Sequence, residues 1–356
     1  MRRAFIKGND AVVCGALLAG CRAFFGYPIT PASEIAHDAM EAIPGAGGIA
    51  LQAESEVAAI NMLYGAGAAG VAAMTATSGP GFSLMQEGIS YMAAARVPGV
   101  IVDVMRSGPG LGNIGPEQGD VAMAIYGGHG DFRVPVFAPD SVREMFDMTS
   151  LAFDTAFRYR TPAIVLADAF VGQMMETLDL PDVLPAADAV PAVRYPLPYA
   201  TDGTTATSGH IVSSLELVPA RLSLKNEARF DDYARMTHEL PMTEVDDPYG
   251  DAPQKIVLIA YGICARIARE AVDVARSLGI RVALFRPMTL WPFPASELLA
   301  CATSSAKITV VELNRGMIRG EVERLTRRPV SGLHRDGGIL PSADEILECV
   351  MREVQS

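Results

Sequence analysis

The sequence is poor in charged residues, and in positive charge most of all. Asp, Glu, Lys and Arg make up 20% of the 356 residues, and 29 Lys and Arg stand against 41 Asp and Glu, a formal net charge of −12. No run of Lys or Arg could follow a phosphate backbone, which argues against nucleic acid as a partner. So few charges would cover the surface of a free monomer poorly, and this indicates a buried subunit interface.

Cysteine is scarce, and its spacing is not that of a metal site. The five cysteines show no CxxC or Cys/His spacing; they are Cys14, Cys21, Cys264, Cys301 and Cys349. We therefore expect no metal ion and no iron–sulfur cluster on this chain. Isolated thiols are typical of a reducing compartment, so the expected location is the cytoplasm.

Long hydrophobic runs are missing as well, so no membrane span is expected. The first 21 residues superficially resemble a lipoprotein signal, with two early arginines and an apolar run before Cys21. Lys7, Asn9 and Asp10 interrupt this segment and leave an apolar stretch at the short end of the range for a signal core. We expect an ordinary helix instead, with Asn9 or Asp10 as its N-cap and with these residues turned inward: Ala11, Leu17, Leu18 and Cys21.

The chain is long enough for two domains, and strands alternate with helices in two regions. In the first region, glycine-rich helices alternate with β-rich runs at residues 71–77, 100–105 and 163–166, typical of a parallel sheet covered on both faces. The second region begins at Lys255, with strands expected at 256–260, 281–285 and 308–311 and helices at 265–278 and 318–325. Both patterns predict doubly wound α/β units.

The segment between these regions has a different composition. Five prolines lie between residues 181 and 198, and a polar stretch follows at 201–208. This composition indicates a long connection, with one helix expected at about 226–237. We thus predict a first domain at 1–180, a connecting segment at 181–253 and a smaller α/β domain at 254–356.

A glycine pattern in the first region looks like a dinucleotide-binding motif but stands in the wrong order. Gly65, Gly67 and Gly70 satisfy GxGxxG, which has meaning only between a strand and the helix that it opens. Here a predicted helix at 56–69 comes first and the strand at 71–77 follows. We therefore reject a nicotinamide site and expect these glycines to let a buried helix pack closely.

Four short segments carry polar residues at turns, strand ends or helix starts of this one sheet. Thr30 lies in the turn GYPITP, Glu54 and Glu56 lie in QAESEV before an apolar helix, TSGPG follows one strand, and Arg106 ends the next. Open α/β sheets bind ligands at the carboxyl ends of their strands. Each feature alone is ordinary turn, cap or surface chemistry, but together they predict a small-anion pocket with a carboxylate beside it.

At these segments the chain resembles the alpha subunit of 2-oxoacid:ferredoxin oxidoreductases. The resemblance rests on GYPITP (26–31), QAESEVAAINMLYGA (52–66), ATSGPGFSLMQEGISY (76–91), MRSGPGLGNIGPEQGD (105–120) and GGHGD (127–131), and in the second region on FRPMTLWPFP (285–294) and VELN (311–314). It covers most of the chain, least clearly at about 186–251. It implies a pyrimidine-type thiamine-diphosphate-binding fold followed by a smaller transketolase C-terminal-like α/β domain.

The resemblance implies roles for a few residues. Glu56 would hydrogen-bond to N1′ of the aminopyrimidine of thiamine diphosphate, with Glu54 as the competing candidate. Thr30 and Arg106 would hold the 2-oxoacid, since Arg offers paired donors to a carboxylate, and Thr30 would also lie at the cofactor. Tyr27 and Pro28 would line the pyrimidine pocket. His129 would lie near the substrate, although a structural histidine fits it equally well.

The implied reaction is oxidative decarboxylation of a 2-oxoacid with coenzyme A, which gives an acyl-CoA, carbon dioxide and two electrons for ferredoxin. The sequence contains neither a GDG motif with a spaced Asn for Mg²⁺ and diphosphate nor a cysteine set for a [4Fe-4S] cluster. These features are therefore expected on a beta subunit, with gamma and ferredoxin-like delta subunits as further partners. The chain is then active only with its partners.

The substrate and two other classes of protein stay open at this point. Residues 108–113 look more like the branched-chain (2-oxoisovalerate) members than the 2-oxoglutarate members, with pyruvate and aryl 2-oxoacids as alternatives. The family's usual Asn-x-Gly-Gln-Met is Asn314-Arg315-Gly316-Met317 here, which removes the contact of that glutamine. A stand-alone thiamine enzyme would need the missing diphosphate motif. A non-catalytic structural subunit would keep the fold without the polar set.

Overall fold

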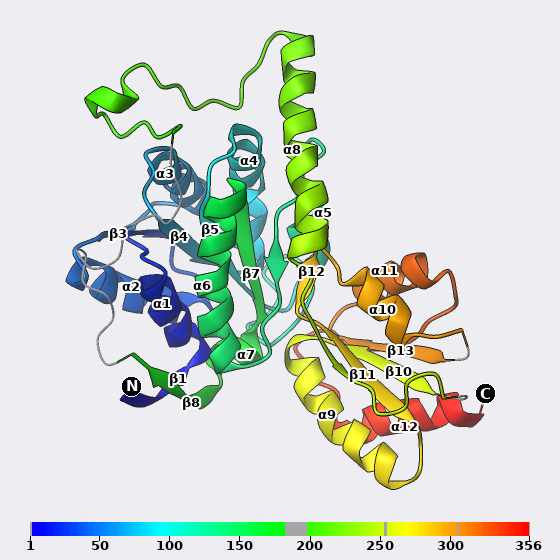
Figure 1. Ribbon diagram of the computed structural model, residues 1–356. Helices are drawn as coiled ribbons and strands as arrows, with labels where there is room; N and C mark the ends of the chain where they lie inside the picture. The colour runs from blue at the N-terminus through cyan, green and yellow to red at the C-terminus, as the bar shows by residue number, and fades with distance from the viewer. Residues whose placement is uncertain (1, 182–197, 253–254, 305, 356) are drawn as a thin grey trace.

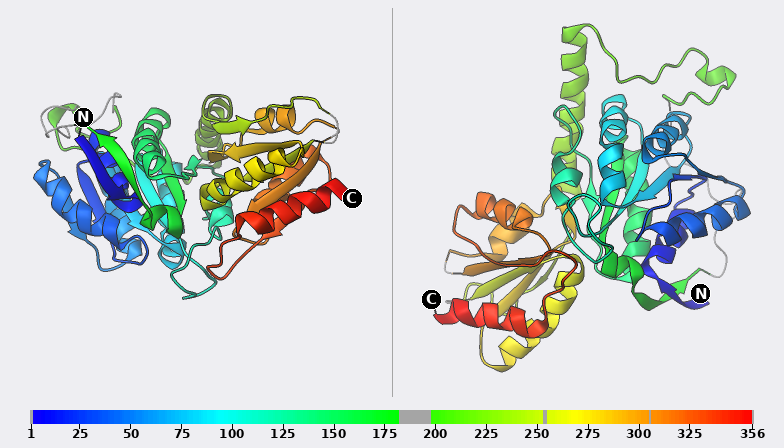
Figure 2. Two further views of the ribbon diagram at one scale, coloured as in Figure 1. Left: turned by 90° about the horizontal axis from the view of Figure 1, so that it is seen from below. Right: turned by 180° about the vertical axis from the view of Figure 1, so that it is seen from behind.

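The computed structural model of the protein describes residues 2–181, 198–252, 255–304 and 306–355. Two sheets organise it, a seven-stranded sheet from the N-terminal part and a five-stranded sheet from the C-terminal part, and we call the elements around them the N-terminal and C-terminal units (Figure 1). In both units helices lie on the two faces of the sheet, and the chain termini lie at opposite ends of the molecule (Figure 2). This is the α/β architecture that the alternating pattern predicts.

The seven-stranded sheet has the order β12-β6-β7-β5-β4-β2-β3, and all its strands are parallel except β12. The central strands are buried on both faces because helices cover both sides. A separate antiparallel pair joins the two ends of the unit, β1 (Arg2–Lys7) and β8 (Met175–Leu180). The strands of the large sheet are β2 (Ala23–Gly26), β3 (Ile49–Gln52), β4 (Ala73–Thr77), β5 (Gly99–Met105), β6 (Val136–Phe137), β7 (Pro162–Asp168) and β12 (Thr289–Trp291).

Alternate residues of each strand face two different helix layers. On β5, Val100, Val102 and Val104 pack with α1, α2 and α6, whereas Ile101 and Met105 pack with α3 and α4. Since side chains alternate along a strand, Asp103 points to the layer of α3 and α4. The helices of this unit are α1 (Gly8–Leu18), α2 (Ser33–Gly45), α3 (Glu56–Ala68), α4 (Gly79–Ala95), α5 (Val121–Tyr126), α6 (Val142–Tyr159) and α7 (Ala169–Gln173).

The start of α1 differs from the prediction, whereas the order of α3 and β4 agrees with it. The N-cap of α1 is Lys7, whose backbone N–H donates to the Asp10 carboxylate, so the prediction of Asn9 or Asp10 as the cap was wrong. Strand β4 follows α3, in the order that excludes a dinucleotide motif. A Cβ on Gly67 would lie 2.3 Å from the backbone oxygen of Pro98, which confirms close packing there, whereas Gly65 faces open space and does not serve it.

The C-terminal unit is a sheet of order β14-β13-β10-β11-β9, parallel except for β9. Helices α9 and α12 pack on one face, and α10 and α11 pack on the other. The elements of this unit are β9 (Thr243–Asp246), β10 (Ile256–Ala260), α9 (Gly262–Ser277), β11 (Val282–Pro287), α10 (Ala295–Cys301), β13 (Lys307–Glu312), α11 (Met317–Thr326), β14 (Ser331–His334) and α12 (Ala343–Gln355).

The connecting segment contains more regular structure than its composition suggests. A short turn of helix, η1 (Thr205–Thr207), precedes helix α8 (Pro219–Glu239), which starts seven residues before the predicted one. Proline suits the first turn of a helix, which explains the earlier start. Helix α8 projects from the body of the molecule (Figure 1), and only Asp232, Tyr233 and Met236 of it are buried. Residues 182–197 lie outside the described part.

An ionic cluster centred on the buried Arg286 joins the two units. Arg286 on β11 is 1% exposed, and its guanidinium pairs with Asp140, Glu144 and Glu244. The distances from Nη1 are 3.2 Å to the Asp140 carboxylate and 2.9 Å to that of Glu244. Arg269 on α9 also pairs with Asp140 and Glu244, at 2.7 and 2.8 Å. We call these five residues the Arg286 cluster.

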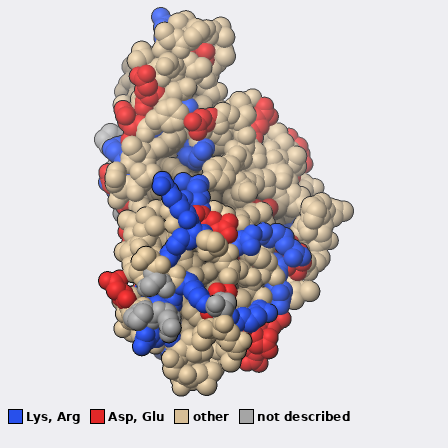
Figure 3. All heavy atoms as spheres, turned by 90° about the vertical axis from the view of Figure 1, so that its right-hand side faces the viewer, with Lys and Arg blue, Asp and Glu red and all other residues tan. Residues whose placement is uncertain are grey.

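The outer side of the C-terminal unit carries mixed charge. Figure 3 shows Lys and Arg side chains gathered there with acidic side chains among them. One arginine of this unit stabilises the end of α10. The guanidinium of Arg328 donates to the backbone oxygens of Ala302 and Thr303, both at 2.8 Å. The last carbonyls of a helix lack partners within it, and a cation there satisfies them.

Candidate functional site

The predicted site residues all follow strands that end at one edge of the seven-stranded sheet. Strands β2, β3, β4 and β5 are parallel, so their carboxyl ends meet at the same edge. Tyr27, Pro28 and Thr30 follow β2, Glu54 and Glu56 follow β3, and Arg106 follows β5. This edge is where open α/β sheets place their ligands.

Arg106 and Thr30 are brought together, although not through the hydroxyl. The Arg106 Nη1 donates to the backbone oxygen of Thr30 at 2.9 Å, while the Thr30 side chain is on an exposed turn. Arg106 lines a cavity of ≈ 1020 Å³, which we call the anchor cavity. Tyr27, 40% exposed, and Pro28 lie on the same turn as Thr30 and are not among the residues that line this cavity.

The two glutamates of QAESEV differ sharply in environment. Glu54 is exposed, whereas Glu56 is the first residue of α3 and only 6% exposed. Ser55 caps the helix by accepting from the backbone N–H of Ala58 at 3.2 Å, which fixes the direction of the residue after it. Among the described residues, none hydrogen-bonds to the Glu56 carboxylate, so this buried acceptor keeps its full capacity for a ligand.

Gly81 allows the Glu56 carboxylate to lie against the first turn of α4. A Cβ on Gly81 would lie 2.4 Å from the Glu56 Oε1 and 2.3 Å from the Thr77 Oγ1. The Thr77 and Ser78 hydroxyls are buried, and neither has a hydrogen-bond partner in the described part of the chain. Buried polar groups normally find partners. A carboxylate and two hydroxyls around one helix start therefore fit the polar edge of a bound heterocycle.

The C-terminal unit contributes the opposite wall of the anchor cavity. Asn314 Nδ2 donates to the Gln118 backbone oxygen at 2.9 Å, and Gln118 bonds in turn to the backbone of Tyr261 and Leu313 through its side-chain amide, each at 3.0 Å. This bonding fixes the loop that carries Arg106 against the second sheet. Gln118 and Asn314 lie in segments that carry the family resemblance, but no local sequence pattern indicates this contact between them.

The altered motif Asn314-Arg315-Gly316-Met317 shapes this wall directly. The Asn314 Oδ1 accepts from the backbone N–H groups of Gly316 and Met317, both at 2.9 Å, at the start of α11. Gly316 has φ +105°, a conformation that favours glycine. Arg315 and Met317 both line the anchor cavity, and Arg315 pairs with Asp336 at 2.7 Å.

Asp168, the last residue of β7, ties the edge of the sheet to α9. Its Oδ2 accepts from the backbone N–H of Ile263 at 2.8 Å, and its Oδ1 accepts from that of Val171 at 3.0 Å. Gly262 has φ +53°, and a Cβ there would lie 2.4 Å from the Asp168 Oδ2. Burial raises the pKa of Asp168 to about 6. Its two hydrogen bonds hold the starts of α7 and α9 against the end of β7.

His129 is not among the described residues that line the anchor cavity. Its Nδ1 is 3.2 Å from the Ser90 Oγ, its ring meets that of Tyr91 edge-on at 6.1 Å, and the residue is exposed. These contacts with α4 favour the structural alternative for this histidine.

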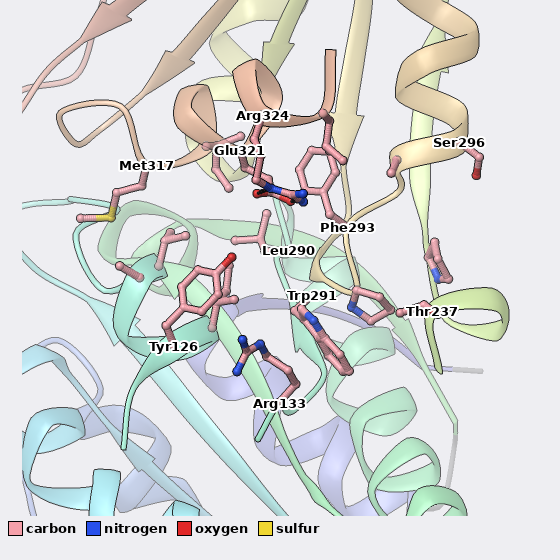
Figure 4. Close-up of a pocket in the computed structure, with 18 residues that line it drawn as sticks. Tyr126, Arg133, Thr237, Leu290, Trp291, Phe293, Ser296, Met317, Glu321 and Arg324 are labelled. Atoms are coloured by element: carbon pink, nitrogen blue, oxygen red, sulfur yellow. Dashed lines mark hydrogen bonds and ion pairs between the residues drawn. The ribbon is translucent and has the colours of Figure 1, made fainter. Parts of the chain in front are cut away.

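A second cavity of ≈ 580 Å³ lies beyond Met317, which lines both cavities. Figure 4 shows Tyr126, Arg133 and Trp291 on one side of it and Arg324 with Glu321 on the other. The Arg133 guanidinium lies 5.0 Å above the Tyr126 ring and 3.4 Å from the Asp131 carboxylate, and Arg324 pairs with Glu321 at 2.6 Å. Both guanidiniums of this second cavity already have anionic partners.

No group of three or more His, Cys, Asp or Glu within the described ranges is arranged to hold a metal ion. All five cysteines lie within the described ranges, and none of them forms a disulfide bond. In this part of the chain, no helix combines the length and the apolar character needed to cross a membrane.

Comparisons with known proteins identify the family of the chain. Residues 14–204 match the family described as "Pyruvate flavodoxin/ferredoxin oxidoreductase, thiamine diP-bdg", and residues 254–346 match "Pyruvate:ferredoxin oxidoreductase core domain II". The chain is 47% identical to the ketoisovalerate oxidoreductase subunit VorB of Methanothermobacter thermautotrophicus, over 99% of this chain and 98% of that one. It is 38% identical to the 2-oxoglutarate synthase subunit KorA of Archaeoglobus fulgidus, over 99% and 100%.

Two solved structures are similar. The 2-oxoglutarate:ferredoxin oxidoreductase of Magnetococcus marinus, with 2-oxoglutarate, coenzyme A and succinyl-CoA bound, matches with a TM-score of 0.87 and 29% identity, over 99% of this chain and 65% of that one. A split-gene transketolase in an inactive beta4 tetramer matches with a TM-score of 0.60 and 11% identity, over 99% of both chains, which shows the fold alone.

The fold and the family matches define a thiamine-diphosphate-binding protein of the pyrimidine type, followed by a transketolase C-terminal-like domain. The chain belongs to the 2-oxoacid:ferredoxin oxidoreductase family and is a subunit of such an enzyme, acting with partner subunits. The family, the fold class and the greater likeness to 2-oxoisovalerate than to 2-oxoglutarate members confirm the resemblance drawn from the sequence.

Proposed function

We propose that this chain supplies the aminopyrimidine half of a thiamine diphosphate site and the anchor for the 2-oxoacid. The overall reaction would convert a 2-oxoacid and coenzyme A to acyl-CoA and carbon dioxide and pass two electrons to ferredoxin. One observation carries the proposal: the buried Glu56 carboxylate and the Arg106 guanidinium lie at one edge of the sheet. The first turn of α4 contacts Glu56 through Gly81 and lines the anchor cavity through Gly79 and Pro80.

The residues of this chain would each do one thing. Thiamine diphosphate, when bound, supplies the electron sink for decarboxylation. Glu56 would hydrogen-bond to N1′ of the pyrimidine, its carboxylate accepting when N1′ carries a proton, and its burial strengthens that bond. Tyr27, Pro28 and Thr30 would line the cofactor. Arg106 would fork onto the substrate carboxylate, with its guanidinium oriented by the Thr30 carbonyl.

The other parts of the enzyme are proposed for partner chains. A beta subunit would carry the diphosphate, Mg²⁺ and a [4Fe-4S] cluster, and gamma and ferredoxin-like delta subunits would complete a cytoplasmic complex. Within this chain, the proposed domain limits stay at 1–180, 181–253 and 254–356, with β9 as a strand that the connecting segment adds to the C-terminal sheet.

The proposed substrate is 2-oxoisovalerate, with 2-oxoglutarate as the second candidate. Leu111 and Met317 line the anchor cavity and suit a branched apolar side chain. Arg315, which lines the same cavity, favours the second candidate because it could bind a distal carboxylate. Its pairing with Asp336 already occupies that guanidinium, and this supports 2-oxoisovalerate.

The test of the proposal is reconstitution. We expect the isolated chain to bind thiamine diphosphate weakly and to release no carbon dioxide from any 2-oxoacid, because it offers half of the cofactor site. The native complex should contain thiamine, absorb as an iron–sulfur protein and reduce ferredoxin or a viologen dye. Turnover by the isolated chain would contradict the proposal, and an active complex without iron–sulfur absorption would count equally against it.

Substitutions at the anchor should weaken every 2-oxoacid alike. Arg106→Lys keeps the charge but loses the paired donors of the guanidinium. In the complex, kcat/KM should therefore fall roughly 5- to 150-fold, which corresponds to a loss of about 1 to 3 kcal/mol in transition-state stabilisation. Thr30→Val leaves the carbonyl that accepts from Arg106 and should cost less. The measurement compares kcat/KM for 2-oxoisovalerate, 2-oxoglutarate and pyruvate. If Arg106→Lys abolished only 2-oxoglutarate turnover, Arg106 would be reading a distal carboxylate and the anchor role would be wrong.

A further inference from the structure

Two buried carboxyl groups meet directly behind Arg106. Asp103 on β5 is fully buried and points toward α4, and among the described residues none donates a hydrogen bond of ordinary geometry to either of its carboxyl oxygens. Its side chain lies within hydrogen-bonding reach of Asp120, which precedes α5 and lines the anchor cavity. The Asp120 Oδ2 is likewise buried and unpartnered, and a Cβ on Gly79 would lie 3.6 Å from it.

Two carboxylates cannot hydrogen-bond to each other, because each can only accept. The contact therefore requires a proton on one of them, as for other carboxyl pairs that share a site. Burial and the neighbouring carboxyl raise the pKa of Asp103 well above its ordinary value, and burial also raises that of Asp120. Both directions agree with the geometry.

The other charged groups around the pair set the balance of charge. Arg106 acts on Asp120 as a neighbouring cation, and Glu117, buried on the same loop, adds negative charge. From α4 the backbone N–H of Gly79 faces Asp103. Glu56 lies across the first turn of α4, and Arg315 and Asp336 line the cavity as a neutral pair.

We propose that Asp103 and Asp120 hold one proton between them, and that this singly charged pair positions Arg106 for the substrate carboxylate. With one proton, the pair presents a single negative charge, which orients the guanidinium and leaves it able to bind an anion. Without that proton, two negative charges would lie beside Arg106 and repel the 2-oxoacid. The inference rests on the proposed anchor role of Arg106, and Asp103 and Asp120 are positioning residues in it.

The experiment uses the reconstituted complex between pH 5.5 and 8.5, with 2-oxoisovalerate as substrate. In the wild type, KM should rise about tenfold for each pH unit above the ionisation of the pair, while kcat changes less. Asp103→Asn replaces the protonated carboxyl by an amide that always donates, so KM should stay low and this rise should disappear. Asp120→Asn should remove the pH dependence too. Asp147→Asn, in an exposed i,i+4 pair on α6, is the matched control and should retain the wild-type profile.

Infrared difference spectroscopy supplies a readout that does not depend on turnover. The wild-type complex should show the C=O stretch of a protonated carboxyl that titrates over the same pH range and is missing in Asp103→Asn. Absence of this band from the wild type at every pH, or an unchanged KM profile in both Asn variants, would overturn the shared proton even if Arg106→Lys is impaired. If the band titrates but Arg106→Lys is unimpaired, Arg106 is not the substrate anchor. The carboxyl pair then cannot position Arg106 for the substrate, and the positioning role is overturned.

Discussion

Replacing Glu56 by Gln should slow hydrogen–deuterium exchange at C2 of thiamine diphosphate in the complex by about a hundredfold or more. The amide is nearly isosteric, so the start of α3 and the contact with Gly81 should survive. What is lost is a buried carboxylate beside a ring nitrogen, and removal of acid–base assistance of this kind costs about 10² to 10⁴ in rate. Exchange is followed by rapid acid quench and NMR, and turnover should fall in parallel.

Glu54→Gln is the matched control for this experiment, since it makes the same change two residues away on an exposed side chain. It should leave the exchange rate within about twofold of the wild type. A larger defect in Glu54→Gln than in Glu56→Gln would show that the two glutamates have been assigned the wrong way round.

Replacing Arg286 by Met should destabilise the protein by about 3 to 5 kcal/mol, the cost of leaving buried carboxylates without their cation. Asp140 is 3% exposed and the Glu144 side chain 18%, so neither can be fully solvated once the guanidinium is gone. Urea unfolding can be followed by the fluorescence of Trp291, the only tryptophan in the sequence, which lies on β12 at the edge of the seven-stranded sheet.

The pH dependence of this loss has a definite sign. Burial raises the pKa of Glu144, and in Arg286→Met this carboxyl also loses the cation that lowers its pKa, so its pKa should lie higher in the folded state than in the unfolded state. The penalty is then complete above that raised value and decreases as the pH falls through it. Arg143→Met removes an exposed pair with Asp147 on α6 and should cost less than about 0.5 kcal/mol at any pH. Equal losses in the two variants would mean that the Arg286 cluster adds no special stability.

The sequence was most informative where local chemistry decides structure. The strands β5 and β7 and the helix α3 could be predicted within about two residues, because short β-rich apolar runs favour buried strands and the longer apolar segment after QAESEV favours a helix. The edge location of Thr30, Glu56 and Arg106 followed as well, since parallel strands end together.

What could not be predicted depends on contacts between distant parts of the chain. No local pattern indicates that β12, three residues long, joins the N-terminal sheet, or that β9 pairs with β11. Asp103 sits inside an otherwise apolar strand and went unremarked, because only the fold brings Asp120 to it. In the same way, Gln118 and Asn314 gain their role from packing between loops that are 196 residues apart.

Strand β11 ends at Pro287 and strand β12 begins at Thr289, so the chain passes from one sheet to the other across Met288 alone. The two halves of this subunit are therefore not interchangeable modules. A chimera joined in the connecting segment would take β12 from one parent and β6 from the other, and a poor match would expose the edge of Val136 and Phe137 to solvent or to another chain. Recombination among such subunits should be tolerated only where both strands come from the same ancestor.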